Sequence, residues 1–129
     1  MRRTMLKSRI HRATVVDSDL DYVGSITIDP ALLEAADIRE HEQVHVVDVN
    51  NGSRFETYTI GGERGTGDIR VNGAAARLVH AGDTIIVISC AEYDELDLED
   101  YAPVVVHVDR DNRIITVDDA VDRLLTERR

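Results

Sequence analysis

The chain has 129 residues and a mass of 14.4 kDa, the size of one domain that can bury a single core. Its 25 acidic and 15 basic residues give a formal net charge of −10, which argues against nucleic acid as a partner, because affinity for phosphates comes from Lys and Arg. The single cysteine, Cys90, excludes an internal disulfide and fits a reducing compartment, so the cytoplasm is the expected location.

The ends of the chain differ in charge but carry no membrane signal. The first 12 residues hold five of the 15 basic residues, whereas residues 92–100 are rich in acids and contain no base. No apolar segment of a secretory signal follows the basic start, and no stretch is apolar for long enough to span a bilayer. We therefore expect no membrane partner.

Alternating apolar and polar residues predict a mainly β chain with short helices. Strands are expected at residues 3–16, 25–28, 43–49, 53–60, 68–71, 84–89, 104–108 and 113–117. Asp29 is a good N-cap and Pro30 suits the first helical position, so a short helix should follow them. A second short helix is expected within residues 72–78 and a terminal helix over residues 118–129, while residues 17–21 are turn formers and residues 92–102 an acidic connector.

Two glycine-containing turns differ in what they predict. Asn50-Asn51-Gly52 predicts a hairpin turn, because Asn and Gly tolerate positive φ. Residues 61–67 contain four glycines and must form a loop. Such a loop can bring backbone N–H groups to an anion, but it lacks the Lys and Ser/Thr ending of a phosphate loop, so a plain turn and a phosphate site are both open readings.

The same order of predicted elements occurs twice in the chain. A strand, a short helix, a tight turn and a strand occur in this order in residues 28–44 and again in residues 71–85. Two such units indicate a small closed barrel built from pseudo-equivalent halves, although units of this kind also arise by chance in β proteins.

The usual catalytic signatures are missing from the sequence. The five histidines have no metal-ligand spacing, so no metal is expected, and neither a G-x-S-x-G elbow nor a dinucleotide fingerprint occurs. On the strand at residues 53–60, Arg54 and Tyr58 should project from one face and Thr57 from the other unless the strand bulges. Asn72 and Gly73 open the second helix, where free backbone N–H groups can hold an anion. These residues alone could be purely structural.

A set of short motifs gives these residues a context. In chain order they are Arg3-Thr4-Met5-Leu6, His11-Arg12, Tyr22-Val23-Gly24-Ser25, Asn51-Gly52 with Arg54, Thr57-Tyr58, Glu63-Arg64-Gly65 and Asn72-Gly73-Ala74-Ala75-Ala76. In this order and spacing, from residue 3 to about residue 90, the chain resembles the pyruvoyl-dependent aspartate 1-decarboxylase family. Residues 92–129 contribute little to the resemblance and form a divergent C-terminal part.

The resemblance implies a double-psi β-barrel, a homotetramer with active sites near subunit interfaces, and a proenzyme that cuts itself between Gly24 and Ser25. The Ser25 hydroxyl would attack the Gly24 carbonyl, with Thr57 as oxyanion donor. Chains 1–24 and 25–129 would result, the second beginning with a pyruvoyl group made from Ser25. This covalent group would be the cofactor.

The resemblance also implies the substrate, L-aspartate, and the roles of the residues around it. The pyruvoyl carbonyl would form a Schiff base with the amine of L-aspartate and take up electrons as the α-carboxylate leaves, giving β-alanine for pantothenate and coenzyme A synthesis. Arg54 would bind a substrate carboxylate and Tyr58 would protonate the carbanion. The residues that would position the substrate are Asn72, Gly73, Ala74 and Ala75.

One residue departs from the family pattern. Many relatives carry lysine at the position of Arg9, next to the carboxylate-binding site. Arg9 keeps the charge but not the geometry, so its contact with substrate is an open question.

Two other readings remain open at this point. The chain could be a small barrel that serves as a binding module, such as a transcription factor with a swapped-hairpin fold, although its acidity is a poor match for DNA. It could also be a proenzyme that matures only with a helper protein.

Overall fold

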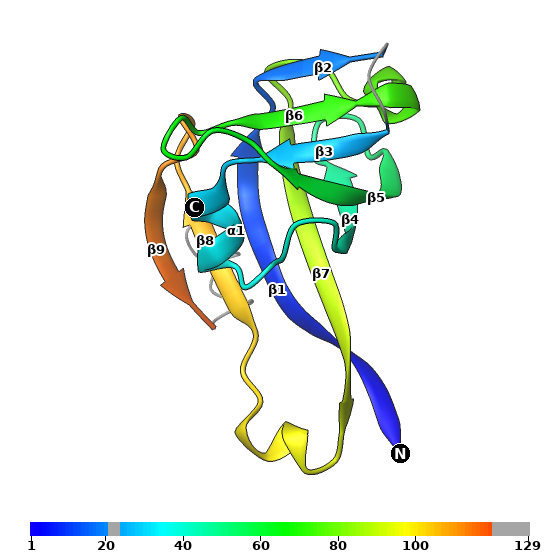
Figure 1. The fold of residues 1–129 in the computed structure, drawn as a ribbon, viewed down its shortest axis with the longest axis vertical. Coiled ribbons are helices and arrows are strands. Elements are labelled where there is room, and N and C mark those ends of the chain that lie inside the picture. Colours follow the sequence, from blue (N-terminus) through cyan, green and yellow to red (C-terminus); the bar gives the residue numbers. More distant parts are fainter. Residues whose placement is uncertain (21–23, 120–129) are drawn as a thin grey trace.

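The computed structural model describes residues 1–20 and 24–119. Its elements are β1 (Arg2–Thr14), β2 (Asp17–Asp19), β3 (Ser25–Ile28), α1 (Pro30–Ala35), β4 (Gln43–Asp48), β5 (Arg54–Gly61), β6 (Ile69–Asn72), η1 (Gly73–Arg77), β7 (Thr84–Asp94), η2 (Asp97–Asp100), β8 (Val104–Val108) and β9 (Ile114–Asp118). Hydrogen bonds join the strands in the order β2-β6-β3-β5-β4-β7-β1-β8-β9. This mainly β arrangement is consistent with the predicted double-psi β-barrel (Figure 1).

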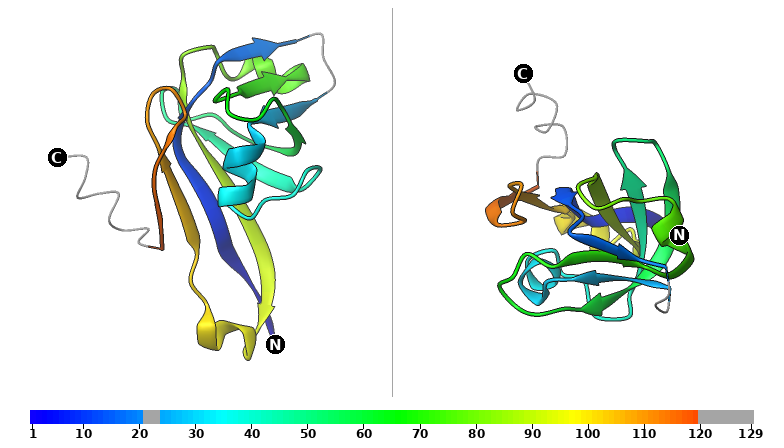
Figure 2. Two further views of the ribbon diagram at one scale, coloured as in Figure 1. Left: turned by 60° about the vertical axis from the view of Figure 1, so that its left-hand side comes forward. Right: turned by 90° about the horizontal axis from the view of Figure 1, so that it is seen from above.

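The two repeated units predicted from the sequence pair with each other. Their first strands, β3 and β6, are antiparallel neighbours, with Ser25 opposite Asn72 and Ile28 opposite Ile69. Their second strands, β4 and β7, are also antiparallel neighbours. Seen from above, the strands of both units surround a common interior (Figure 2). The strand–helix–strand order predicted twice from the sequence is therefore present twice in the structure, as β3-α1-β4 and β6-η1-β7.

The core consists of aliphatic side chains from nearly every strand. Fully buried examples are Ile10, Ile26, Ile28, Leu32, Val44, Val46, Ile69, Val71, Ile85 and Val87. On β3 and β6 the core takes Ile26, Ile28, Ile69 and Val71, so Ser25, Thr27 and Asn72 lie on the opposite face. The repeats thus pack through one face of these strands and leave the other for polar residues.

Asp29 connects the end of β3 to the glycine-rich loop. Its carboxylate is 3% exposed and accepts a hydrogen bond from Ala31 N (2.8 Å), which caps α1 as predicted. The same carboxylate accepts from Gly65 N (3.0 Å) and Gly67 N (2.9 Å). Gly65 and Gly67 both have positive φ, so the loop is a turn, and the anion held by these two N–H groups is a side chain of the chain itself rather than a phosphate.

Several predicted boundaries were wrong, chiefly those around residues 17–19 and 89–94. Asp17–Asp19 form a strand rather than a turn, because they pair in parallel with β6. Strand β7 continues to Asp94, beyond residue 89, because β1 supplies partners as far as Arg2. The two strands run together into the long extension at the bottom of Figure 1, so residues 92–94 of the expected connector are strand and only η2 follows.

The C-terminal hairpin of β8 and β9 agrees with the prediction. Asn112, in its turn, is buried and donates to Thr14 O and Gly67 O, both at 2.8 Å, while Thr14 N donates to its Oδ1. Asp118 ends β9 instead of beginning a helix, and the rest of the expected terminal helix lies outside the described residues.

The Asp29 carboxylate generates a prediction about stability. Replacing it in Asp29→Asn puts an N–H donor among backbone donors, so we expect the free energy of unfolding at pH 7 to fall by about 1–3 kcal/mol. Burial alone would raise the pKa of this carboxyl, but the N–H groups of Gly67, Ala31 and Gly65 outweigh burial and hold the pKa below its usual value. The native state therefore favours the ionised form, and the difference between wild type and variant should shrink as the pH falls through that lowered pKa.

Urea unfolding of both proteins between pH 2 and pH 7 measures this effect. Glu34→Gln is the matched control, because Glu34 pairs with Arg64 of the same loop but is exposed, and exposed pairs contribute little. Equal stability of Asp29→Asn and wild type at pH 7 would contradict the proposed role of Asp29.

Candidate functional site

The candidate site is built from the polar face of three adjacent strands, β6, β3 and β5. Ser25 is the first residue of β3 and is fully buried. Asn72, the last residue of β6, lies directly opposite it and is 3% exposed. Asn72 Nδ2 donates a hydrogen bond to Ser25 Oγ at 3.0 Å and a second one to Thr27 Oγ1 at 3.0 Å. The serine hydroxyl is therefore held by a side chain from the other repeat.

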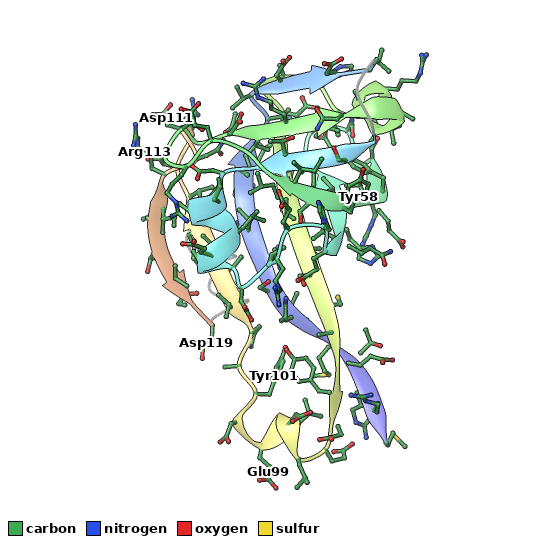
Figure 3. All side chains as sticks on the ribbon, in the orientation of Figure 1. Tyr58, Glu99, Tyr101, Asp111, Arg113 and Asp119 are labelled. Carbon is green, nitrogen blue, oxygen red and sulfur yellow. The ribbon has the colours of Figure 1, made fainter. Side chains whose placement is uncertain are left out.

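On its other side, β3 runs parallel to β5, with Ile26 level with Thr59 and Thr27 level with Ile60. Continued towards the start of β3, this register brings Ser25 level with Tyr58 and Gly24 level with Thr57. Tyr58 projects from β5 on the side of the molecule where β3 begins (Figure 3). The two candidate catalytic side chains thus come from neighbouring strands at the same height.

The face that each β5 residue occupies follows from a regular pairing with β4, in which Arg54 lies opposite Val47, Thr57 opposite Val44 and Tyr58 opposite Gln43. No bulge interrupts the register, so Arg54 and Tyr58 share one face and Thr57 projects from the other, the face of the buried Val44. Arg54 is exposed at the start of the strand, as a side chain that captures an anion from solvent must be.

The helix η1 extends the site beyond Asn72. Gly73 is buried and has φ 73°, a left-handed conformation that a side chain disfavours, and this turn leads the chain from β6 into η1. Ala74 is exposed and Ala75 is half-buried against the core. Small residues follow Asn72 directly, and no side chain larger than a methyl group occurs before Arg77.

Gly24 has open space around it. Among the described residues, a Cβ added to Gly24 would meet no atom within 4 Å. Tyr22 and Val23, which complete its motif, lie outside the described residues. The Cβ position of Gly24 therefore faces space that the described residues leave open.

Arg9 is not brought to this site within one chain. It pairs with Ile88 of β7, and β7 and β4 lie between β1 and β5 in the sheet. Burial lowers the pKa of Arg9, and its Nε is buried without a hydrogen-bond partner among the described residues. Arg9 thus lies on a strand that is not a neighbour of β3, β5 or β6 in the sheet.

Metal and membrane signals are absent from the described part of the chain. Within residues 1–20 and 24–119, no group of three or more His, Cys, Asp or Glu side chains could hold a metal ion. No helix there is long and apolar enough to cross a membrane.

Sequence reasoning missed Thr27, which shares the Asn72 amide with Ser25. The signal was present, because residues two apart on a strand share a face, and a Thr two residues after a reactive Ser lies beside it. What the sequence could not supply was Asn72 opposite Ser25, which depends on the pairing of strands 47 residues apart.

Comparison with known proteins gives a consistent result. The family profile described as "Aspartate decarboxylase" matches residues 1–115. The curated "Aspartate 1-decarboxylase" of Acetivibrio thermocellus is 61% identical over 114 residues, which cover 88% of this chain and 90% of that protein. The match runs to residue 115, past the last motif that carries the resemblance.

Proposed function

This chain belongs to the aspartate decarboxylase family, and we propose that it is a self-processing, pyruvoyl-dependent enzyme that converts L-aspartate to β-alanine and carbon dioxide for pantothenate and coenzyme A synthesis. The observation that carries the proposal is the buried Ser25 hydroxyl, held by Asn72 across the β3–β6 pair and level with Tyr58 of β5. A binding module would have no need of this arrangement.

The first role of the site is to cut the chain. We propose that Ser25 Oγ attacks the Gly24 carbonyl carbon, so that the amide bond breaks and an ester forms with the Ser25 amine set free. Elimination across the Ser25 Cα–Cβ bond then releases residues 1–24 with the Gly24 carboxylate, and hydrolysis releases ammonia from residue 25. Thr57, level with Gly24, is the proposed donor to the oxyanion. The open space at Gly24 and the oriented Ser25 hydroxyl support this step.

The pyruvoyl group that replaces Ser25 supplies an electron sink for the electrons left by the departing carboxylate. The described residues fit such a group, since Gly73 and Ala74, which follow Asn72, carry no side chain larger than a methyl group. Arg54 would bind a carboxylate of aspartate through its planar guanidinium. Tyr58, on the same face of β5, would deliver the proton to the α-carbon of the substrate.

The proposal extends to assembly and location. We propose a homotetramer with active sites near subunit interfaces, in which Arg9 reaches the substrate from a neighbouring copy. The separation of β1 from β5 in the sheet supports this, as do the exposed apolar side chains of the edge strand β9, Ile115 (66%) and Val117 (47%). The free Cys90 fits the reducing cytoplasm.

The first prediction concerns cleavage. Intact mass spectrometry of purified protein should give fragments 1–24 and 25–129, the larger with a blocked N-terminus, and Ser25→Ala should remain whole because it has no nucleophile. Ser18→Ala, which changes a serine on β2, is the control and should be cleaved like wild type. A wild-type chain that stays whole after prolonged heating and in cell extract would contradict the proposal, whereas cleavage only in extract would point to a maturation helper.

The second prediction separates cleavage from turnover. Tyr58→Phe should be cleaved but should lose at least about 100-fold in kcat, since general acid catalysis contributes roughly 10²–10⁴-fold. Tyr93→Phe is the matched control, because Tyr93 packs against Tyr101 on the long extension and should retain full activity. Carbon dioxide release from labelled aspartate measures turnover.

Two results would count against these assignments. A Tyr58→Phe chain that is not cleaved would mean that Tyr58 acts in processing. Treatment of cleaved wild-type protein with borohydride and aspartate should attach substrate at position 25. The absence of an adduct would contradict the proposed Schiff base between the pyruvoyl carbonyl and the aspartate amine.

A further inference from the structure

His41 occupies a backbone position that favours glycine. Its φ is 72°, in the left-handed region that residues with a side chain seldom adopt. His41 N donates to Thr59 O at 2.8 Å and Thr59 N donates to Glu42 O at 3.1 Å, so two residues lie opposite one, just beyond the regular pairing of β4 with β5. This is the arrangement of a β-bulge, whose first residue is often a left-handed glycine. A side chain at this position therefore needs an explanation.

The His41 side chain contacts Tyr58, the residue labelled on β5 in Figure 3. The two ring centroids are 6.4 Å apart and the rings are inclined at 70°, an edge-to-face geometry that aromatic rings prefer. Within residues 1–20 and 24–119, His41 is the one aromatic neighbour of Tyr58, and the Tyr58 hydroxyl makes no hydrogen bond there. The imidazole is therefore the group that defines the orientation of the Tyr58 ring in this part of the chain.

The loop between α1 and β4 holds His41 by contacts on both sides of it. Before His41, Arg39 O accepts a hydrogen bond from Thr59 Oγ1 of β5 at 2.8 Å. After it, the Glu42 carboxylate pairs with Lys7 Nζ of β1 at 2.9 Å and accepts from Arg39 N at 3.2 Å. These contacts fix the loop to β5 and to β1, so a fixed backbone carries the imidazole.

From these contacts we propose that His41 is a positioning residue for proton delivery: its ring holds the Tyr58 ring so that the phenol hydroxyl stays directed at the α-carbon of the substrate. This inference rests on the proposed decarboxylation and on the role of Tyr58 in it. The bond to the α-carboxylate breaks, carbon dioxide leaves, and the electron pair left behind forms a C–H bond with the Tyr58 proton, which water then replaces. If the Tyr58 ring turned away, water would protonate the α-carbon from either side.

Glycine at position 41 separates this role from a role in folding. His41→Gly removes the ring but suits the left-handed backbone, so its melting temperature should equal or exceed that of wild type. His41→Asn also lacks the ring and tolerates positive φ. His41→Phe keeps a ring beside Tyr58. If His41 were only a part of the loop, the Gly and Asn variants would be fully active.

Steady-state kinetics of the processed variants measures the effect. His41→Gly and His41→Asn should lose about fivefold in kcat, the factor that corresponds to one aromatic contact. KM for aspartate should stay within about twofold of wild type, because Arg54 is unchanged. His41→Phe should stay within about twofold of wild type in kcat. Should the Phe variant fold poorly at a left-handed position, as its melting temperature would show, the Gly and Asn variants decide the question.

The configuration of the product gives a readout that lost stability does not change. In deuterium oxide the Tyr58 hydroxyl carries deuterium, so wild type should place it on one side of the amine-bearing carbon of β-alanine. His41→Gly should give both configurations, which NMR of a chiral derivative distinguishes. A single configuration from His41→Gly, whatever its rate, would overturn the inference, and so would a wild-type kcat.

The ring contact can also be tested without turnover. In Ser25→Ala protein, which should not be processed, His41→Gly should shift the NMR signals of the Tyr58 ring protons, because a neighbouring aromatic ring is removed. Unchanged signals would show that the two rings do not meet and would overturn the inference.

Asp37→Gly is the matched control. Asp37 lies in the same loop, is exposed and also has positive φ, at 54°. Its backbone oxygen accepts from Lys7 Nζ at 2.6 Å, a contact that glycine preserves. The variant keeps the His41 ring, so its kcat and its product configuration should match wild type. A slow Asp37→Gly would show that any change in the loop lowers turnover and would overturn the role of His41.

The outcomes separate this inference from the proposed function. If wild-type protein forms no β-alanine, the proposed function fails, and the role of His41 fails with it. If Tyr58→Phe keeps full activity, the roles of Tyr58 and His41 fail while the decarboxylase stands. If activity depends on Tyr58 but His41→Gly keeps the wild-type kcat, only the role of His41 fails.

Discussion

The site depends on the register between β3 and β6, and Asp29 fixes that register from one end. Its backbone N–H donates to Asp68 O at 2.7 Å, while its carboxylate binds the loop that leads into β6. Since the two strands are antiparallel, a fixed contact at Asp29 and Asp68 determines that Ser25 meets Asn72 at the other end. A slip of one residue would turn Asn72 into the core and the aliphatic Val71 towards Ser25. A charged group at the far end of the strand pair therefore sets the geometry of Ser25, the proposed nucleophile.

The glycine-rich loop, residues 61–67, which the Asp29 carboxylate binds, shows how much of this region the sequence could predict. Glycines at 65 and 67 predicted a turn with N–H groups free to bind an anion, and Asp29 predicted a helix cap. Each prediction was correct by itself. The sequence could not show that the same Asp29 carboxylate caps α1 and binds the glycine-rich loop. Asp29 and Gly67 are 38 residues apart and meet only through the tertiary fold. Local preferences specify which groups need a partner, but not which partner they find.

The elements that the sequence failed to predict share the same cause. Asp17, Ser18 and Asp19 are turn formers, yet β6 offers them a strand to pair with, and tertiary pairing outweighs local preference. The residues at 92–94 are polar and alternate weakly, so only the long partner strand β1 makes them β-structure. Residues 43–48 alternate so clearly between apolar and polar side chains that the sequence alone predicted a strand there. The candidate site combines both cases: its residues were predictable from motifs, whereas their contacts depended on long-range pairing.

A cofactor made from the chain itself places unusual demands on the residues around it. On the proposed mechanism, Asn72 would orient a hydroxyl before cleavage, and after cleavage the same amide would face a carbonyl group and a substrate. A rigid anchor that does not change between the two states is then more useful than a second contact to Ser25. Thr27 also contacts this amide, because its methyl group packs against the Gly62 backbone and its hydroxyl lies 3.0 Å from Asn72 Nδ2. The strand that supplies the serine thus also supplies a second partner for Asn72.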